Sequence, residues 1–259
     1  MEKNVILSLK NVSKTFPVGK SLLGRPTKFV HAVNDVSFDV YEGETFSIVG
    51  ESGCGKSTTG RTILRLIEKT EGTILFNGED VSDVDKKKLR ELRTKMQIIF
   101  QDPYSSLSPR LPIGEIIGEA VKEHNLVPKN EYDAYISQVM KNCGLQDYHK
   151  DRYPHEFSGG QRQRICIARA LALNPEFIVC DEPVSALDVS IQAQIINLLK
   201  ELQEKMNLTY LFISHDLSLV KRLCHRIVVM NKGDIVEAGD TENIFYHPKD
   251  AYTKQLIDA

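Results

Sequence analysis

Residues 45–58 read Thr-Phe-Ser-Ile-Val-Gly-Glu-Ser-Gly-Cys-Gly-Lys-Ser-Thr, an apolar run followed by a glycine-rich loop. Gly50, Gly55, Lys56 and Ser57 fit the pattern G-x-x-x-x-G-K-[ST], whose glycines let backbone N–H groups turn inward around phosphate oxygens. Apolar residues recur at helical spacing after Lys56, so the loop is expected to join a strand to a helix N-terminus, which stabilises anions. A chance match is the alternative. The stretch predicts an α/β fold with a nucleotide site, in which Lys56 reaches the β- and γ-phosphates and Ser57 binds Mg²⁺.

A second candidate site is an acidic pair that follows a buried strand. Phe177–Cys180 are four apolar residues, and Asp181 and Glu182 follow them directly. In parallel sheets, ligands bind at the carboxyl ends of the strands. Asp181 is therefore expected to hold Mg²⁺, and Glu182 to orient or deprotonate the attacking water. The alternative is a strand that ends in a solvated acidic turn.

Two further polar residues also end apolar runs. His215 follows the predicted strand 209–214, and Gln101 follows Met96–Phe100. His215 is placed to sense the γ-phosphate, and the Gln101 amide to contact Mg²⁺ or water. A structural histidine and a polar loop residue are the respective alternatives.

The segment Ser158-Gly-Gly-Gln161 precedes a predicted helix over 162–173. A small hydroxyl, exposed amides and a helix N-terminus together favour an anion site. A chain with one nucleotide does not need a second phosphate site so far along the sequence, but two chains packed head to tail do. The alternative is an ordinary helix capped by Ser158.

The order of elements predicts the architecture. Strands are expected at Ile6–Leu9, Val36–Val40 and Thr73–Phe76, with an exposed loop over Pro17–Lys28. From Val84 to about Leu173 the pattern is mainly helical. Strands and helices then alternate, which is typical of a core with parallel strands.

Composition narrows the class of protein. The 259 residues are 41% hydrophobic and 26% charged with a net charge of −2, which gives no general attraction to nucleic acid. No apolar run approaches the roughly 18 residues of a membrane span, and no secretory signal is visible. The five cysteines are scattered, which favours buried thiols over disulfides or a metal site. A cytoplasmic protein that reaches a membrane only through a partner is expected.

These motifs together resemble the nucleotide-binding subunit of ATP-binding cassette (ABC) transporters over nearly the whole chain. The resemblance implies a P-loop NTPase core with a mixed, mainly parallel sheet, an N-terminal antiparallel β region and an inserted helical subdomain. One domain over 1–259 is expected, with 1–83 and 174–259 as the core and 84–173 as the helical subdomain. In the order of the family, the motifs are Walker A (50–58), the Q-loop (Gln101), the signature (158–161), Walker B (177–182), the D-loop (185–188) and the H-loop (His215).

The resemblance also implies roles for individual residues. Glu182, His215 and Gln101 would be catalytic, and Ser57, Gln101 and Asp181 would bind Mg²⁺. Phe16 would stack on adenine, with Phe29 as its rival. The residues that would contact ATP are Phe16, Gly50, Ser52, Gly53, Cys54, Gly55, Lys56, Ser57, Thr58, Ser158, Gly159, Gly160 and Gln161. Phe157 replaces the usual leucine before the signature and keeps an apolar anchor.

A finer resemblance is to the second ATPase of oligopeptide, dipeptide and nickel importers, carried by Phe100–Arg110, Pro154–Gly160 and the tail from His247. It implies a heterodimer with a second ATPase, permease docking through Gln101–Arg110, an extracytoplasmic solute-binding protein and a position on the inner membrane face. Many peptide importers continue beyond such a tail, so peptides and nickel or metallophore complexes both stay open as solutes. The alternative function is a soluble accessory ATPase of a multi-enzyme complex such as carbon–phosphorus lyase. A nucleotide kinase would lack Ser158–Gln161 and Asp188.

Overall fold

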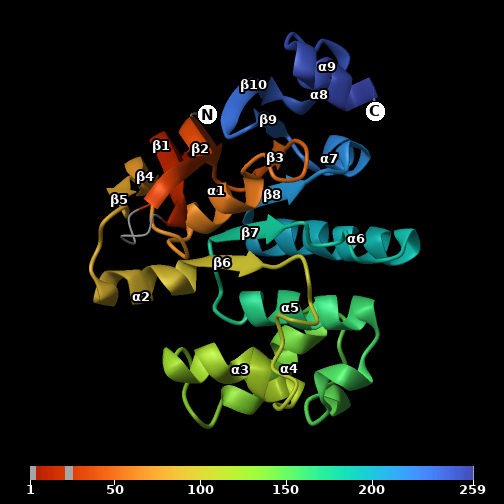
Figure 1. Ribbon diagram of the computed structural model, residues 1–259. Helices are drawn as coiled ribbons and strands as arrows, with labels where there is room; N and C mark the ends of the chain where they lie inside the picture. Colours follow the sequence, from red (N-terminus) through yellow and green to blue (C-terminus); the bar gives the residue numbers. More distant parts are fainter. Residues whose placement is uncertain (1–3, 21–25, 259) are drawn as a thin grey trace. The chain divides into compact units, whose positions relative to one another are not determined.

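The structure is a computed structural model that describes residues 4–20 and 26–258. The chain divides into two compact units (Figure 1). The first unit comprises Met1–Arg90 and Thr209–Ala259, and the second comprises Glu91–Leu208. The predicted division, with a helical subdomain over 84–173, differs in its bounds and stays a prediction.

The first unit contains an antiparallel sheet with the strand order β2-β1-β4-β5. Its strands are β1 (Val5–Lys20), β2 (Pro26–Tyr41), β4 (Glu71–Phe76) and β5 (Glu79–Asp80). The predicted loop over Pro17–Lys28 is wrong where the structure describes it, because β1 and β2 pair as far as Lys20↔Pro26. Cross-strand hydrogen bonds between main-chain groups do not require apolar side chains, so the polar composition was misleading. The rest of that prediction, residues 21–25, lies outside the described residues.

The first unit also contains the strands that hold the glycine-rich loop, in the order β10-β9-β3-β8. β3 (Thr45–Val49) runs parallel to β8 (Thr209–Ser214) and to β9 (Arg226–Asn231), whereas β10 (Asp234–Asp240) is antiparallel to β9. All residues of β3 and β8 are buried, as expected for parallel strands covered on both faces. This mixed arrangement beside an antiparallel sheet confirms the predicted fold class.

In the described part of the first unit, four helices follow these strands. They are α1 (Lys56–Ile63), α7 (Leu217–Leu223), α8 (Thr241–Tyr246) and α9 (Ala251–Asp258). The start of α1 at Lys56 agrees with the sequence prediction. The C-terminal helices α8 and α9 were not predicted, since they are short and only partly amphipathic.

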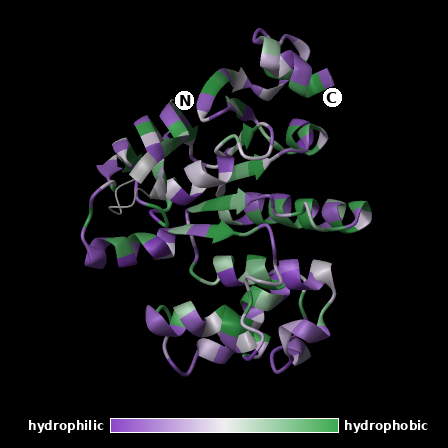
Figure 2. Cartoon of the chain, in the orientation of Figure 1, coloured by the Kyte–Doolittle hydropathy of each residue, from purple (hydrophilic) through white to green (hydrophobic). Residues whose placement is uncertain are grey.

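The second unit joins a parallel strand pair to helices. β6 (Met96–Ile99) pairs with β7 (Phe177–Asp181), and β7 is buried throughout. The helices are α3 (Ile113–Glu123), α4 (Tyr132–Asn142), α5 (Gly159–Leu171) and α6 (Val189–Met206), while α2 (Lys86–Lys95) spans the boundary between the units. Two 3₁₀ turns, Asp147–His149 and Pro154–Glu156, lie between α4 and α5. In Figure 2, β7 is coloured mainly as hydrophobic, whereas α2 is coloured mostly as hydrophilic.

None of the helices within residues 4–20 and 26–258 has the length and apolar character needed to cross a membrane. All five cysteines are buried free thiols, as the sequence analysis expected. Burial raises the pKa of Cys143 to about 12 and that of Cys166 to about 11, so both stay protonated at neutral pH.

The close approach of β4 to β1 generates a stability prediction. Gly72 (φ 89°) and Gly78 (φ 78°) are both left-handed, but only at Gly72 would a Cβ fall against the main chain, 2.6 Å from the Val12 Cα. At Gly78 the same Cβ would meet open space. Gly78→Ala is expected to lower stability by about 1 kcal/mol through backbone strain alone. Gly72→Ala should lose at least about 2 kcal/mol, because the clash with the main chain adds to the strain. Thermal unfolding of both variants checks this, and equal losses would contradict it.

Candidate functional site

The residues predicted to form the site fall into two groups, one in each unit. The glycine-rich loop, His215 and Phe16 belong to the first unit. Gln101, Ser158–Gln161 and the Asp181–Glu182 pair belong to the second.

The glycine-rich loop joins the buried strand β3 to helix α1. Gly50, Gly53 and Gly55 all have positive φ angles, of 148°, 83° and 111°. A Cβ on Gly50 would collide with the Met230 carbonyl oxygen, and one on Gly55 would collide with the Ala32 carbonyl oxygen. Glycine is therefore required at both positions for sterics as well as for the backbone angles. Gly55 provides no side-chain cap for α1, whose first N–H groups are the kind of donors that bind an anion.

Lys56 is 4% exposed and lies inside this loop. Its Nζ donates to the carbonyl oxygens of Gly50 at 2.7 Å and Glu51 at 2.8 Å. The buried ammonium is therefore paired with main-chain dipoles within the loop. A phosphate is a stronger partner for an ammonium than a neutral carbonyl, so the arrangement suits the phosphates of a nucleotide.

Cys54 lies beside the lysine, with its Sγ 3.9 Å from the Lys56 Nζ. Burial raises the pKa of the Cys54 thiol, and the nearby ammonium opposes this effect only in part. The side chain at this place in the loop is therefore a neutral thiol at pH 7.

His215 lies at the same edge of the sheet as the loop. Val49 of β3 pairs with Ser214 of β8, so Gly50 and His215 each follow a paired residue on parallel strands. The Ser214 Oγ accepts a hydrogen bond from the Asp216 N–H, and Asp216 caps α7 by accepting from the Leu219 N–H. The exposed His215 is thereby held on a defined turn between strand and helix.

The two candidate adenine-stacking aromatics lie on the hairpin of β1 and β2. Phe16 pairs with Val30 and Pro17 pairs with Phe29, so the two phenylalanines project from opposite faces of the hairpin. Phe16 is half-buried, with the Lys14 ammonium 4.8 Å from its ring centroid, whereas Phe29 is 58% exposed. One bound base could stack on only one of the two rings.

In the second unit, Gln101 and Glu182 are in direct contact. The Gln101 Nε2 donates to a Glu182 carboxylate oxygen at 3.0 Å. The contact follows from the parallel register, because Ile99 pairs with Cys180 and both side chains follow at the carboxyl ends of β6 and β7. Asp181, the last residue of β7, is 2% exposed. The sequence alone placed Gln101 and Glu182 at one site, and the structure joins them.

Glu182 adopts a left-handed backbone conformation, with φ of 49°. This conformation is unfavourable for a residue with a side chain and is frequent at functional sites. The turn is held by Ser185, whose N–H and Oγ both donate to the Glu182 carbonyl oxygen at 3.3 and 3.1 Å. Glu182 is therefore fixed by its neighbours in an orientation that a regular strand would not provide.

Ser158 caps α5 in the way that the alternative interpretation expected. Its Oγ accepts from the Gln161 N–H at 3.4 Å, and the Gln161 Oε1 accepts from the Ser158 N–H at 3.0 Å. A Cβ on Gly160 would lie 2.5 Å from the Ile191 Cγ2, so α6 packs tightly against this turn. Because Ser158 acts as an acceptor in the cap, its hydroxyl proton is still available to donate to an anion.

Sequence reasoning missed several residues that contact these motifs. The Gln192 Nε2 donates to the carbonyl oxygens of Val184 and Leu187, which fixes the turn before Asp188. The Tyr252 hydroxyl accepts from the Glu51 N–H of the glycine-rich loop at 3.0 Å. In the sequence, the tail containing Tyr252 was notable only for its resemblance to a family. No local pattern predicts the contact between Tyr252 and Glu51, which are 201 positions apart.

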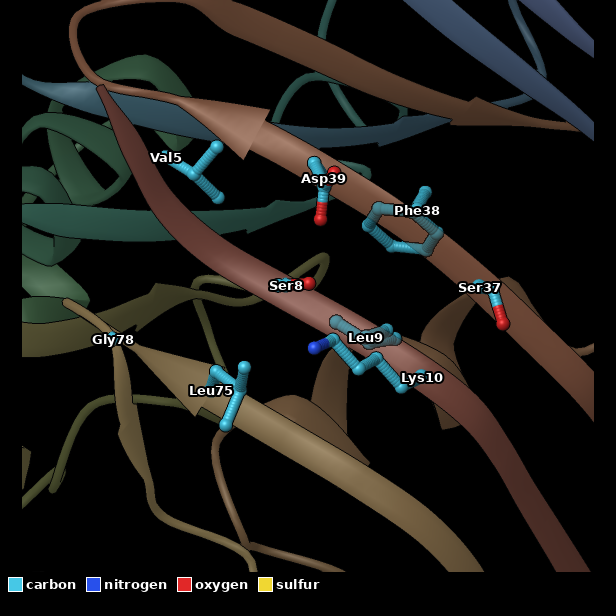
Figure 3. A pocket seen from close by; sticks show the side chains of 9 residues that line it. All are labelled: Val5, Ser8, Leu9, Lys10, Ser37, Phe38, Asp39, Leu75 and Gly78. Atoms are coloured by element: carbon cyan, nitrogen blue, oxygen red, sulfur yellow. The ribbon is translucent and has the colours of Figure 1, made fainter.

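The antiparallel sheet carries a separate hollow of about 550 Å³, lined among others by Ser8, Lys10 and Asp39 (Figure 3). None of the site residues predicted from the sequence lines it.

Comparison with known proteins identifies the family of the chain. The family described as "ABC transporter" matches residues 33–185. The glutathione import ATP-binding protein GsiA of Pectobacterium atrosepticum is 52% identical over 254 residues, and that of Escherichia coli strain K12 is 53% identical. Each match covers 98% of this chain and 41% of the relative, so the chain spans about two fifths of the length of these proteins.

Solved structures with the same fold include two ABC proteins. The dimeric cassette MJ0796 in a post-hydrolysis state bound to ADP and Pi superposes with a TM-score of 0.79 at 31% identity, covering 91% of this chain and 98% of that one. The cbiO1 protein of Clostridium perfringens, part of the transporter complex cbiONQ, gives 0.79 at 27% identity, covering 95% of this chain and 92% of that one. With the family match over more than half of its residues, this chain belongs to the ABC transporter family.

Proposed function

We propose that this chain binds and hydrolyses MgATP and that hydrolysis drives the uptake of small peptides through a membrane permease. The observation that carries the proposal is the contact between Gln101 and Glu182, formed at the carboxyl ends of two parallel strands. Such a contact gives a carboxylate a fixed direction, which a general base needs. Nickel or metallophore complexes are the second solute class, and the names of the GsiA relatives favour peptides over them.

The chain's own residues would act in sequence on bound ATP. Lys56 would leave the carbonyl oxygens of Gly50 and Glu51 for the β- and γ-phosphates. Glu182 would orient and deprotonate the attacking water, and His215 would hydrogen-bond the γ-phosphate. Phe16, rather than Phe29, would stack on the adenine.

Mg²⁺ would be held by the Ser57 hydroxyl, the Asp181 carboxylate and the Gln101 amide oxygen. Oxygen ligands of this kind suit Mg²⁺, and the Gln101 bond to Glu182 uses the amide nitrogen, which leaves the amide oxygen for a metal. When bound, the ion would neutralise charge that develops on the phosphates.

A second cassette would complete each site with its own Ser158–Gln161 turn. The exposed Ser158 cap and the α5 N-terminus provide donors for a phosphate held by the other chain. The structural neighbour MJ0796 is dimeric. We propose a heterodimer with a related ATPase at the inner face of the membrane, served by a solute-binding protein on the far side.

Docking to the permease is proposed for the segment 101–110, whose residues contact α5, the helix that begins in the signature motif. The Arg162 guanidinium lies 5.2 Å from the Tyr104 ring centroid, and Arg169 donates to the Ser106 carbonyl oxygen. The Cys166 Sγ lies 3.9 Å from the Pro103 carbonyl oxygen. We therefore propose that a displacement of this segment would move α5, whose first residue follows Ser158.

The first test concerns the general base. Glu182→Gln removes the proton acceptor but keeps an oxygen near Gln101, so ATP binding should persist while turnover falls at least about 100-fold. Steady-state ATPase assays of the assembled transporter and equilibrium ATP binding measure the two effects. Turnover close to that of the unmodified protein would refute the assignment of Glu182.

The second test concerns docking. Tyr104 is 64% exposed, and Tyr148, in the same unit but outside 101–110, is 70% exposed. Tyr104→Ala should weaken permease binding roughly 10- to 30-fold, as for an aromatic anchor at an interface, with ATP affinity unchanged. Tyr148→Ala serves as the matched control and should bind the permease as the unmodified chain does. Equal effects of the two changes would argue against docking at 101–110.

The third test identifies the partners. The Glu182→Gln chain, isolated from its own cells in mild detergent with MgATP, should carry two permeases, a second ATPase and a solute-binding protein. Mass spectrometry detects them. Recovery of soluble enzymes without a permease would overturn the importer and favour an accessory ATPase of a soluble complex.

A further inference from the structure

Helix α9 contacts the phosphate-binding loop through the side chain of Tyr252. The Tyr252 hydroxyl accepts a hydrogen bond from the Glu51 N–H at 3.0 Å. Burial raises the pKa of Tyr252, so the phenol is neutral at physiological pH and accepts through an oxygen lone pair.

Tyr252 is held in place by a chain of hydrogen bonds from β10. The Glu237 carboxylate accepts from the N–H groups of Lys249 and Asp250 at 3.0 and 3.1 Å. Asp250 in turn accepts from the N–H groups of Tyr252 and Thr253 at 2.8 and 3.3 Å. Burial of Glu237 opposes its ionisation, but the main-chain donors outweigh burial and lower its pKa. The start of α9 is therefore anchored to the hairpin of β9 and β10. The turn of this hairpin also contacts the loop, because the Gly233 N–H donates to the Cys54 carbonyl oxygen at 2.9 Å.

The Tyr252 bond acts on a peptide group that Lys56 also holds. The Gly50 carbonyl and the Glu51 N–H belong to one planar peptide unit. The Lys56 Nζ donates to the Gly50 carbonyl oxygen of this unit at 2.7 Å. On the opposite side of the unit, the Glu51 N–H donates to the Tyr252 hydroxyl. Gly50 directly follows β3, so the orientation of this peptide unit fixes the direction in which the chain enters the loop.

Phosphate binding changes this balance, because Lys56 is the residue expected to turn to the phosphates. Once the lysine leaves the Gly50 carbonyl, the bond to Tyr252 still restrains rotation of the peptide unit. We propose that Tyr252 is a positioning residue of the phosphate-binding loop, which keeps the loop in its binding shape while Lys56 contacts the nucleotide. The inference rests on the proposed function only in that the loop binds ATP.

The test replaces the hydroxyl alone. Tyr252→Phe keeps the ring and should weaken ATP and ADP binding roughly 2- to 12-fold, the effect of one hydrogen bond. KM for ATP should rise by the same factor while kcat stays within about twofold, a split that general destabilisation would not produce. Tyr246→Phe is the matched control, because Tyr246 is 64% exposed and lies in α8, where the Lys221 ammonium contacts its ring.

A second variant and a direct measurement complete the design. Glu237→Gln weakens the anchoring of α9 without touching Tyr252 and should lower ATP affinity in the same direction, so it decides the question if Tyr252→Phe does not fold. Hydrogen exchange of the Glu51 amide with ADP bound should be faster in Tyr252→Phe than in Tyr246→Phe. Unchanged affinity and unchanged exchange in the folded variant would overturn the inference. An unmodified chain that fails to bind ATP would instead refute the proposed function.

Discussion

The parallel pairing of strands is the constraint on which the rest of the structure depends. Because β3 and β8 are in register up to Val49 and Ser214, the glycine-rich loop and His215 leave the sheet at one edge. The pairing of Ile99 with Cys180 does the same for Gln101 and Glu182. Side-chain packing on both faces of β3, β7 and β8 favours these registers, since a shift of one residue would move every side chain to the opposite face. The position of each candidate site residue therefore depends on hydrophobic packing several residues away.

The parts of the site that the sequence could predict are those in which the residue type itself determines the local backbone structure. Gly50 and Gly55 could be predicted because their backbone angles are unfavourable for residues with a side chain. The structure adds a second reason, since a Cβ at either position would collide with a neighbouring carbonyl oxygen. The strand ends near Asp181 and Ser214 could be predicted because apolar runs, Phe177–Cys180 and Tyr210–Ile213, form most of each buried strand. What these residues do with a nucleotide stays a prediction.

The parts that sequence could not predict depend on pairing between distant segments. The hairpin of β1 and β2 extends through a polar, proline-containing stretch. The sequence did not indicate this, because main-chain hydrogen bonds between strands do not depend on side-chain composition. The Tyr252 contact with Glu51 joins residues 201 positions apart, and only the folded chain brings them together. The left-handed backbone conformation of Glu182 could not be predicted from the sequence either, since glutamate does not favour that conformation.

The two carbonyl oxygens that hold Lys56 have a consequence for the order of the loop. A buried ammonium without a partner would destabilise the fold. The partners of the Lys56 ammonium are the carbonyl oxygens of Gly50 and Glu51, both within the glycine-rich loop. The loop therefore supplies its own compensation for the buried charge, so its shape does not depend on an anion from outside the chain.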